Sequence, residues 1–251
     1  MRLMKRILSA AAVLALSASL LVGCSSGTAS SVPVSASSAA ESTVSSVEET
    51  ASSAVDENEA AAAQLLNDLT GSYQELWPVI LADEYKQTWL DDCTALVGED
   101  NAEAAFEKLS SMVTGDVYGE DAVKAYANGG GAYFCGFTNG LATLTFDGET
   151  STISGTDKDG NVLFSHTYHY IGMEPVRGLY EFESDDADSG EFTYFFLAPD
   201  TSAETYHIEF RYGSDAEALS QYDAGEYAYW LASGISTDCD QTMIDNCIEL
   251  F

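Results

Sequence analysis

The chain has 251 residues and a formal net charge of −32, with 41 Asp and Glu against nine Lys and Arg. So acidic a protein repels phosphates and anionic headgroups, which excludes nucleic acid and direct docking on anionic lipid as partners. Its 14 tyrosines and 11 phenylalanines are enough for a sizeable core.

The first 23 residues have the pattern of a bacterial secretory signal. Three cations within the first six residues precede an apolar run at residues 7–22, which is shorter than the ~20 residues of a membrane-spanning helix. The run ends in Leu-Val-Gly-Cys, which resembles the lipobox of bacterial lipoproteins, whose cysteine is acylated and becomes the mature N-terminus. We therefore expect Cys24 to anchor the protein to the outer face of a bacterial cell membrane. Losing three cations in the signal moves the net charge from −32 to about −35.

Residues 24–56 follow the signal and are rich in Ser and Ala, with one proline and no aromatic residue. Such a segment cannot bury enough apolar surface to fold, so we predict a flexible tether. Residues 57–251 are of ordinary size for a single domain.

The domain opens with predicted helices at 57–68, 70–81, 84–97 and 101–112. In the second of these, Tyr73, Leu76 and Ile80 recur at helical spacing. Pro78 inside that stretch predicts a kink or a helix boundary near Trp77.

From about residue 117 the apolar period changes to two, which is typical of strands. We predict strands at 132–137, 141–146, 151–156, 162–171, 178–184, 191–198 and 205–212. Several turns between them carry Asn-Gly or Asp-Gly pairs, the residues of tight hairpins. Short helices at 214–222 and 237–250 complete the domain. The predicted fold is mainly β with flanking helices, an antiparallel meander that closes into a barrel.

The strand at 205–212 carries the most distinctive polar residues. Its apolar face holds Tyr206, Ile208, Phe210 and Tyr212, and its other face holds Thr205, His207, Glu209 and Arg211. A polar site is most expected at His207, because an imidazole stands there beside a carboxylate. The alternative is a half-exposed strand histidine without a ligand. His166 and His169 lie three apart on one strand, so they face opposite sides and cannot share one metal.

Four cysteines follow Cys24, at positions 93, 135, 239 and 247. Export would permit disulfides. Cys239 and Cys247 are eight residues apart on a predicted helix, too far to bridge each other. Free buried thiols and bridges to other elements both stay open.

Three stretches carry a family resemblance. They are Leu-Thr-Gly-Ser-Tyr-Gln-Glu-Leu-Trp-Pro at 69–78, Gly-Leu-Tyr-Glu-Phe at 178–182 with the segment up to 194, and the segment from Ala-Pro at 198–199 to Ala-Leu at 218–219. Together with the C-terminal helix they resemble the ZinT family of exported zinc-binding proteins. The resemblance implies a calycin-like (lipocalin-like) barrel with flanking helices.

The resemblance also implies where a metal would sit, and there the chain departs from the family. Two family zinc histidines bracket an aromatic residue, and the corresponding residues here are Thr205, Tyr206 and His207. The upstream histidine before the Ala-Pro step and the His-rich N-terminal segment are absent. The resemblance implies divalent metal binding, most plainly of zinc, at His207, and a metal transporter as a partner. The family has no ligand at the position of His169, so His169 and Glu209 are further candidate ligands on their residue types alone.

Two other functions stay open on the sequence. One is a calycin-type cavity for a small apolar or peptide ligand, and the other is a cell-surface protein that binds a partner through the aromatic patch at residues 227–230. No Ser-His-Asp order, phosphate loop or nucleophile elbow occurs, so we expect no enzyme.

Overall fold

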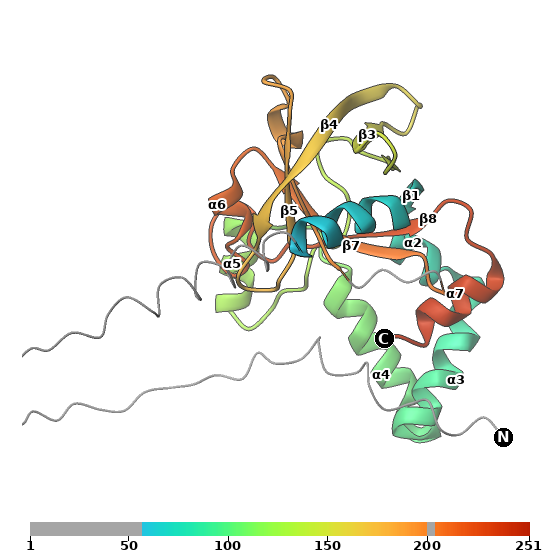
Figure 1. The fold of residues 1–251 in the computed structure, drawn as a ribbon. Helices are drawn as coiled ribbons and strands as arrows, with labels where there is room; N and C mark the ends of the chain where they lie inside the picture. Colours follow the sequence, from blue (N-terminus) through green and yellow to red (C-terminus); the bar gives the residue numbers. More distant parts are fainter. Residues whose placement is uncertain (1–56, 200–203) are drawn as a thin grey trace, which may run out of the picture. The chain divides into compact units, whose positions relative to one another are not determined.

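Eight antiparallel strands form a closed barrel in the computed structural model, which describes residues 57–199 and 204–251 (Figure 1). Each strand pairs with the next, and the last pairs with the first. The strands are β1 Gly71–Glu75, β2 Thr143–Asp147, β3 Thr152–Thr156, β4 Val162–Met173, β5 Tyr180–Ser184, β6 Tyr194–Leu197, β7 His207–Gly213 and β8 Ala232–Ser236. The predicted antiparallel barrel with flanking helices is confirmed.

Helices surround this barrel. They are a helix at residues 57–68, then α2 Leu76–Ile80, η1 Asp83–Tyr85, α3 Lys86–Val97, α4 Glu99–Val113, α5 Glu120–Ala127, η2 Gly190–Phe192, α6 Ala216–Leu219 and α7 Gln241–Ile248. No helix in the described ranges is long and apolar enough to cross a membrane. The predicted signal, the acylated Cys24 and the tether lie outside the described residues.

The two strands that close the barrel are the ones that the sequence did not predict. Residues 71–75 were predicted as helix, but they form β1, in which Tyr73 pairs with Leu144 on one side and Ser236 on the other. The helical spacing arises because β1 runs directly into α2, so apolar residues of a strand and a helix follow one another. The other missed strand, β8, has the sequence Ala-Ser-Gly-Ile-Ser, whose small residues have little strand propensity.

Two predictions between residues 117 and 137 were also wrong. Residues 120–127 form α5, with acidic Glu120 and Asp121 in the first turn and Lys124 in the last, a charge order that suits the helix dipole. Residues 132–137 form no continuous strand, and Phe134 makes only isolated bridges, to Thr114 and Trp230. Tertiary packing keeps this segment extended without a full hydrogen-bonded partner.

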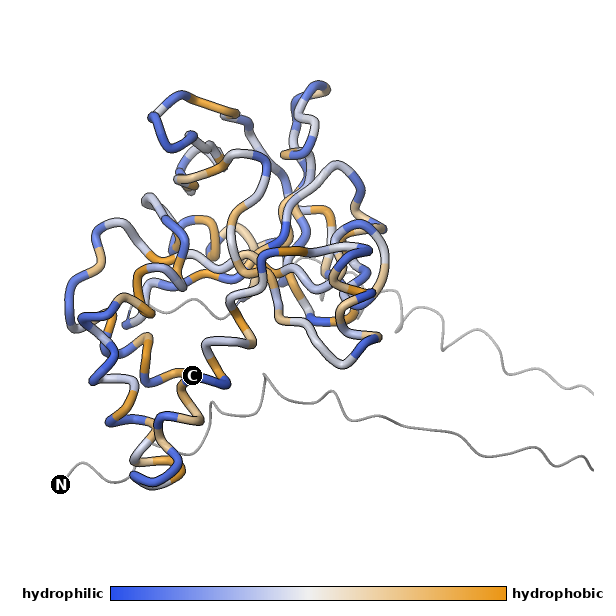
Figure 2. Tube along the Cα trace, turned by 180° about the vertical axis from the view of Figure 1, so that it is seen from behind, coloured by the Kyte–Doolittle hydropathy of each residue, from blue (hydrophilic) through white to orange (hydrophobic). Residues whose placement is uncertain are grey.

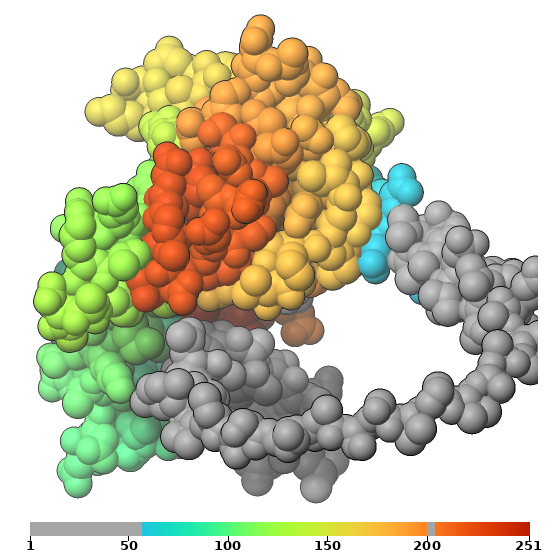
Figure 3. Space-filling view, turned by 90° about the vertical axis from the view of Figure 1, so that its left-hand side faces the viewer, coloured from blue at the N-terminus to red at the C-terminus, as the bar shows by residue number. Residues whose placement is uncertain are grey.

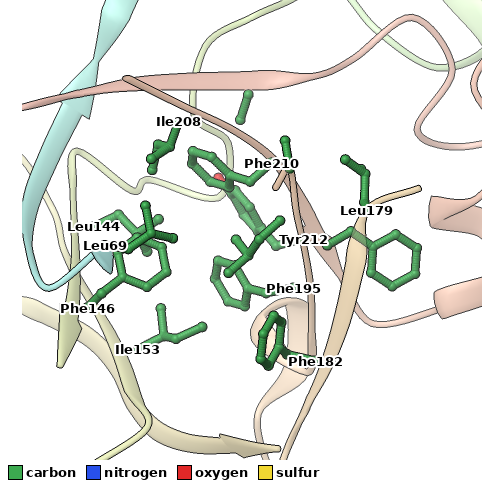
Figure 4. Packing of buried hydrophobic residues seen from close by; sticks show 14 of the residues in the cluster. Leu69, Leu144, Phe146, Ile153, Leu179, Phe182, Phe195, Ile208, Phe210 and Tyr212 are labelled. Atoms are coloured by element: carbon green, nitrogen blue, oxygen red, sulfur yellow. The ribbon is translucent and has the colours of Figure 1, made fainter. Parts of the chain in front are cut away.

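Aromatic and aliphatic side chains fill the barrel. Ile208, Phe210 and Tyr212 of β7 point into the same interior as Phe146 and Phe195 (Figure 4), and all five are almost fully buried. The predicted alternation is therefore confirmed for Ile208, Phe210 and Tyr212, whereas Tyr206 lies before the strand and is not part of its buried face. Hydrophilic residues gather in the loops that connect the elements (Figure 2).

A second apolar cluster lies between the barrel wall and the helices. It contains Leu76, Trp77, Ile80, Trp89, Cys135, Ile235, Ile244, Cys247 and Ile248. The indole nitrogen of Trp89 donates to the carbonyl of Ile80 at 2.6 Å, so this buried donor is satisfied. Burial of this cluster holds α2, α3 and α7 against strand β8.

One buried cation holds the segment at residues 214–231 against the barrel. The side chain of Arg211 is fully buried, and its guanidinium donates to the carbonyls of Leu219, Gln221 and Tyr227. Its Cζ lies 4.4 Å from the ring centre of Tyr222, a cation–π contact. Burial lowers the pKa of Arg211 to about 10, so the side chain stays charged at neutral pH.

Tyr222 extends this contact to the β4–β5 turn. Its hydroxyl donates to Glu174 Oε2 at 3.2 Å, and the fully buried Glu174 also accepts from the backbone N–H groups of Val176 and Arg177. Consistent with these contacts, segment 214–231 lies between α5 and the β4–β5 region on the surface (Figure 3). A buried polar network thus joins three elements that are distant in sequence.

We predict that Arg211→Met destabilises the protein by about 3 kcal/mol, because three buried carbonyls lose their donor while the volume is nearly kept. Urea unfolding measures the loss, and hydrogen exchange should rise in residues 219–229. Lys158→Met, which removes an exposed cation from a hairpin, is the matched control and should change stability by less than about 0.5 kcal/mol. Equal unfolding midpoints for the two variants would contradict the role given to Arg211.

Candidate metal-binding face of strand β7

Strand β7 is buried on both sides. With Ile208 and Phe210 in the barrel interior, alternation places His207, Glu209 and Arg211 on its outer side. His207 and Arg211 are buried there, and Glu209 is partly exposed. The sequence predicted the polar outer side of β7, but its period of two predicted only one buried face, whereas both faces are buried and His207 is not half-exposed.

A strained turn sets the orientation of His207. Tyr206 has a φ of +47°, a conformation that bulky residues rarely adopt. Its carbonyl accepts from the N–H of Ser236 at 2.9 Å, which holds the turn against β8. In this conformation the hydroxyl of Thr205 lies 2.9 Å from His207 Nδ1. Both side chains are buried.

The contact with Thr205 bears on which ring nitrogen can bind a metal. When the hydroxyl oxygen of Thr205 accepts from Nδ1, that nitrogen keeps the ring proton and Nε2 keeps its lone pair. Metal-binding imidazoles are oriented by a hydrogen bond of this kind at the nitrogen that does not bind. The arrangement of His207 is therefore compatible with a metal ligand at Nε2.

Glu209 stands two residues from His207 on the same side of the strand. Its charge acts on the thiol of Cys135, whose pKa burial raises to about 12 with a further contribution from Glu209. Cys135 lies beside β8, where its carbonyl accepts from the N–H of Ser233 at 3.0 Å. The carboxylate thus faces the same outer side of β7 and β8, and the neighbouring sulfur is a neutral thiol.

The C-terminal residue contacts His207, and helix α7 contacts the segment just before it. The ring of Phe251 meets the imidazole edge to face, with centroids 6.3 Å apart. Asn246 of α7 donates its side-chain amide to the carbonyl of Glu204 at 3.0 Å, which fixes the chain just before the Thr205 turn. Thr205 and Phe251 thus contact the imidazole itself, and α7 holds the segment that precedes it.

The structure does not bring His169 to this face. His169 Nδ1 lies 2.7 Å from Asp185 Oδ1 on the outside of β4. Strands β4 and β7 are separated by β5 and β6, so their backbones are roughly 14 Å apart around the wall and their outer sides point in different directions. His166 makes a separate pair with Asp186, also at 2.7 Å.

A tetrahedral zinc site uses three or four N, S or O ligands that converge. Within residues 57–199 and 204–251, no group of three or more His, Cys, Asp and Glu side chains lies close enough to hold a metal ion. The four cysteines in these ranges are free thiols. Of the ligands predicted from sequence, His207 and Glu209 share the outer side of β7, and His169 lies elsewhere.

The interior of the barrel does not favour the alternative of a calycin-type cavity. Phe146, Phe182, Phe195 and Phe210 occupy it and are almost fully buried (Figure 4). A groove of about 370 Å³ lies elsewhere, beside α4 and α5.

Two features of this face could not be predicted from the sequence. They are the contact of Thr205 with His207 and the position of Cys135 near Glu209. The contact of Thr205 depends on the left-handed backbone conformation of Tyr206. Bulky residues rarely adopt this conformation, so the sequence does not predict it. The second depends on the pairing of residues 133–135 with β8, which joins segments about a hundred residues apart. Only the strand period, which places residues 207 and 209 on one side, could be read in advance.

No protein-family model matches the chain, and no curated protein matches it. Among solved structures, the chain is similar to the Zn(II)-bound ZinT-like domain of Streptococcus pneumoniae AdcA, with 15% identity over 72% of this chain and 87% of that chain and a TM-score of 0.45. It is also similar to Zn(II)-bound AdcA from the same organism, with 15% identity over 73% of this chain and 34% of that chain and a TM-score of 0.43. At such identity the likeness concerns the fold alone.

We predict that Thr205→Val, which keeps the shape but removes the hydroxyl, lowers stability by about 1 kcal/mol because the buried hydrogen bond between the hydroxyl and Nδ1 is lost. Thr205→Ser keeps the hydroxyl and should restore most of that loss. Thermal unfolding measures stability, and the ¹⁵N shifts of the imidazole report its tautomer. If the serine variant is as unstable as the valine variant and the tautomer is unchanged in both, the hydroxyl does not orient His207.

Proposed function

We propose that this chain, which has a ZinT-like fold, binds a divalent metal ion through His207 and Glu209 on the outer side of β7. The observation that supports the proposal most is the position of these two donors, two residues apart on one side of a strand. The contact between Thr205 and Nδ1 at 2.9 Å adds the hydrogen bond that orients a metal-binding imidazole.

Zinc is the first ion to test. It binds imidazole nitrogen and carboxylate oxygen, and it accepts water at open positions of its coordination shell. The net charge of −32 raises the concentration of cations near the surface. Two protein ligands predict a weak site that exchanges its ion readily, as a protein that passes metal to a transporter requires.

We also propose that the protein acts on the outer face of the membrane, anchored through acylated Cys24. The basic start, the apolar run and the Leu-Val-Gly-Cys ending support this placement. The domain would then collect cations close to the membrane, where a transporter lies.

Titration calorimetry of the full chain with zinc tests the metal site. We expect saturable binding near one ion per chain. If the dissociation constant is ~100 µM, 1 mM zinc stabilises the fold by about 1.4 kcal/mol, which thermal unfolding detects. Heats equal to those of dilution, with an unchanged melting curve, would refute the proposal.

Three variants locate the site. His207→Gln and Glu209→Gln should each weaken zinc binding about tenfold or more. His169→Gln removes a different imidazole, which pairs with Asp185 on β4, and should leave the affinity unchanged. Equal loss in His169→Gln and His207→Gln would place the binding elsewhere or make it a diffuse effect of charge.

The anchor has a separate test. In bacterial cells, Cys24→Ser should move the protein from the detergent phase to the aqueous phase when membranes are partitioned, because the acyl chains are lost. A protein that stays in the detergent phase without Cys24 is held by something else.

A further inference from the structure

A groove outside the barrel carries an inference that does not depend on the metal site. It has a volume of about 370 Å³ and lies between the end of α4, helix α5 and residues 131–132. Its lining combines the small apolar residues Val117, Ala122, Ala125 and Ala132 with Ser111, Thr114, Gly115, Asp116 and Gly131. This volume is within the range of sites that bind small ligands or single side chains.

Backbone contacts hold the two walls of the groove in place. The N–H of Gly115 donates to the carbonyl of Tyr133 at 3.0 Å, and the N–H of Tyr133 donates to the carbonyl of Met112 at 2.8 Å. A Cβ at position 115 would come within 2.7 Å of the carbonyl oxygen of Ala132, so glycine permits the close approach. The groove is therefore preformed, which lowers the cost of binding.

The one charged residue among the described residues that line the groove is acidic, although Lys108 stands on α4 one turn before the lining residue Ser111. Asp116 lines it and is exposed, and Glu120 and Asp121 lie on the first turn of α5. Lys124 is the nearby cation on α5, and it already pairs with Asp121 at 2.9 Å and Glu120 at 3.8 Å. Asp116 would repel an anionic ligand, whereas a cationic ligand could pair with this carboxylate at the edge of the groove.

A lysine or arginine side chain has this combination of properties, because an aliphatic stem carries a charged head. We propose that the groove binds a lysine or arginine side chain of a basic partner peptide. The stem lies against Ala122, Ala125 and Ala132, and the head pairs with Asp116. The acidity of the whole chain attracts such a partner from a distance, and the groove selects the side chain.

The test uses the full chain and fluorescein-labelled acetyl-Ala-Ala-Lys-Ala-Ala-amide, followed by fluorescence anisotropy in 50 mM salt. Peptides with norleucine or diaminopropionate in place of lysine remove the charge or shorten the stem. We expect the lysine peptide to bind and each substitute to bind several-fold more weakly. If the diaminopropionate peptide binds as well as the lysine peptide, the groove does not bind the aliphatic stem and the proposal is wrong. If the lysine peptide does not bind at all, the proposal is also wrong.

Variants of the protein distinguish the groove from general attraction. Ala125→Leu fills the groove and should weaken binding at least about tenfold. Leucine is a good helix former, so α5 should be preserved. Asp116→Asn should weaken it about threefold, as for one exposed ion pair. Asp159→Asn makes the same charge change on the β3–β4 hairpin and is the matched control, with no change expected.

Equal effects of Asp116→Asn and Asp159→Asn, with Ala125→Leu binding as the wild type does, would show diffuse electrostatic attraction and overturn the proposal. Should Ala125→Leu fail to fold, Asp116→Lys provides the second variant. It places a lysine at the rim of the groove and should abolish binding while the far-ultraviolet circular dichroism stays that of the wild type. Full binding by a folded Asp116→Lys protein would also overturn the proposal.

Discussion

The structure depends on the burial of strand β7 on both of its faces. Inside the barrel, Phe210 and Tyr212 of β7 are buried by packing against other aromatic side chains. Outside it, buried polar side chains must find partners, because an unpaired polar group away from water costs ~1–3 kcal/mol. Arg211 finds them in three backbone carbonyls, and His207 lies against the hydroxyl of Thr205. These contacts decide which parts of the chain cover the barrel.

The same constraint connects the fold to the proposed activities. The strand period that buries Ile208 and Phe210 also places His207 and Glu209 on one outer side of β7, where the ring of Phe251 contacts His207. The segment that Arg211 holds carries Ala228, whose carbonyl accepts from Gly119 at the start of α5, and α5 forms one wall of the groove. Arg211, which lies on the same side of β7 as the proposed ligands, therefore also supports one wall of the groove.

The sequence predicted the middle of the barrel well and its closure poorly. Strands β2 to β7 have a period of two and hairpin turns rich in glycine, so local residues carry the signal. Strands β1 and β8 lack it, since Tyr73 and Ile235 each stand among small or polar residues. They are strands because each pairs with a neighbour on both sides, and the pairing of β1 with β8, which joins Tyr73 to Ser236, has no local signature in the sequence.

By itself the sequence determined the acidic character of the protein, the barrel class and the shared side of His207 and Glu209, because each follows from composition or from a period of two. Only the tertiary structure decided that His169 pairs with Asp185 away from β7, that Thr205 contacts His207, and that the backbone of Gly115 packs against that of Ala132 beside a groove. The physical reason is that these contacts join distant segments, whose meeting depends on how the barrel closes and on strained turns such as Tyr206.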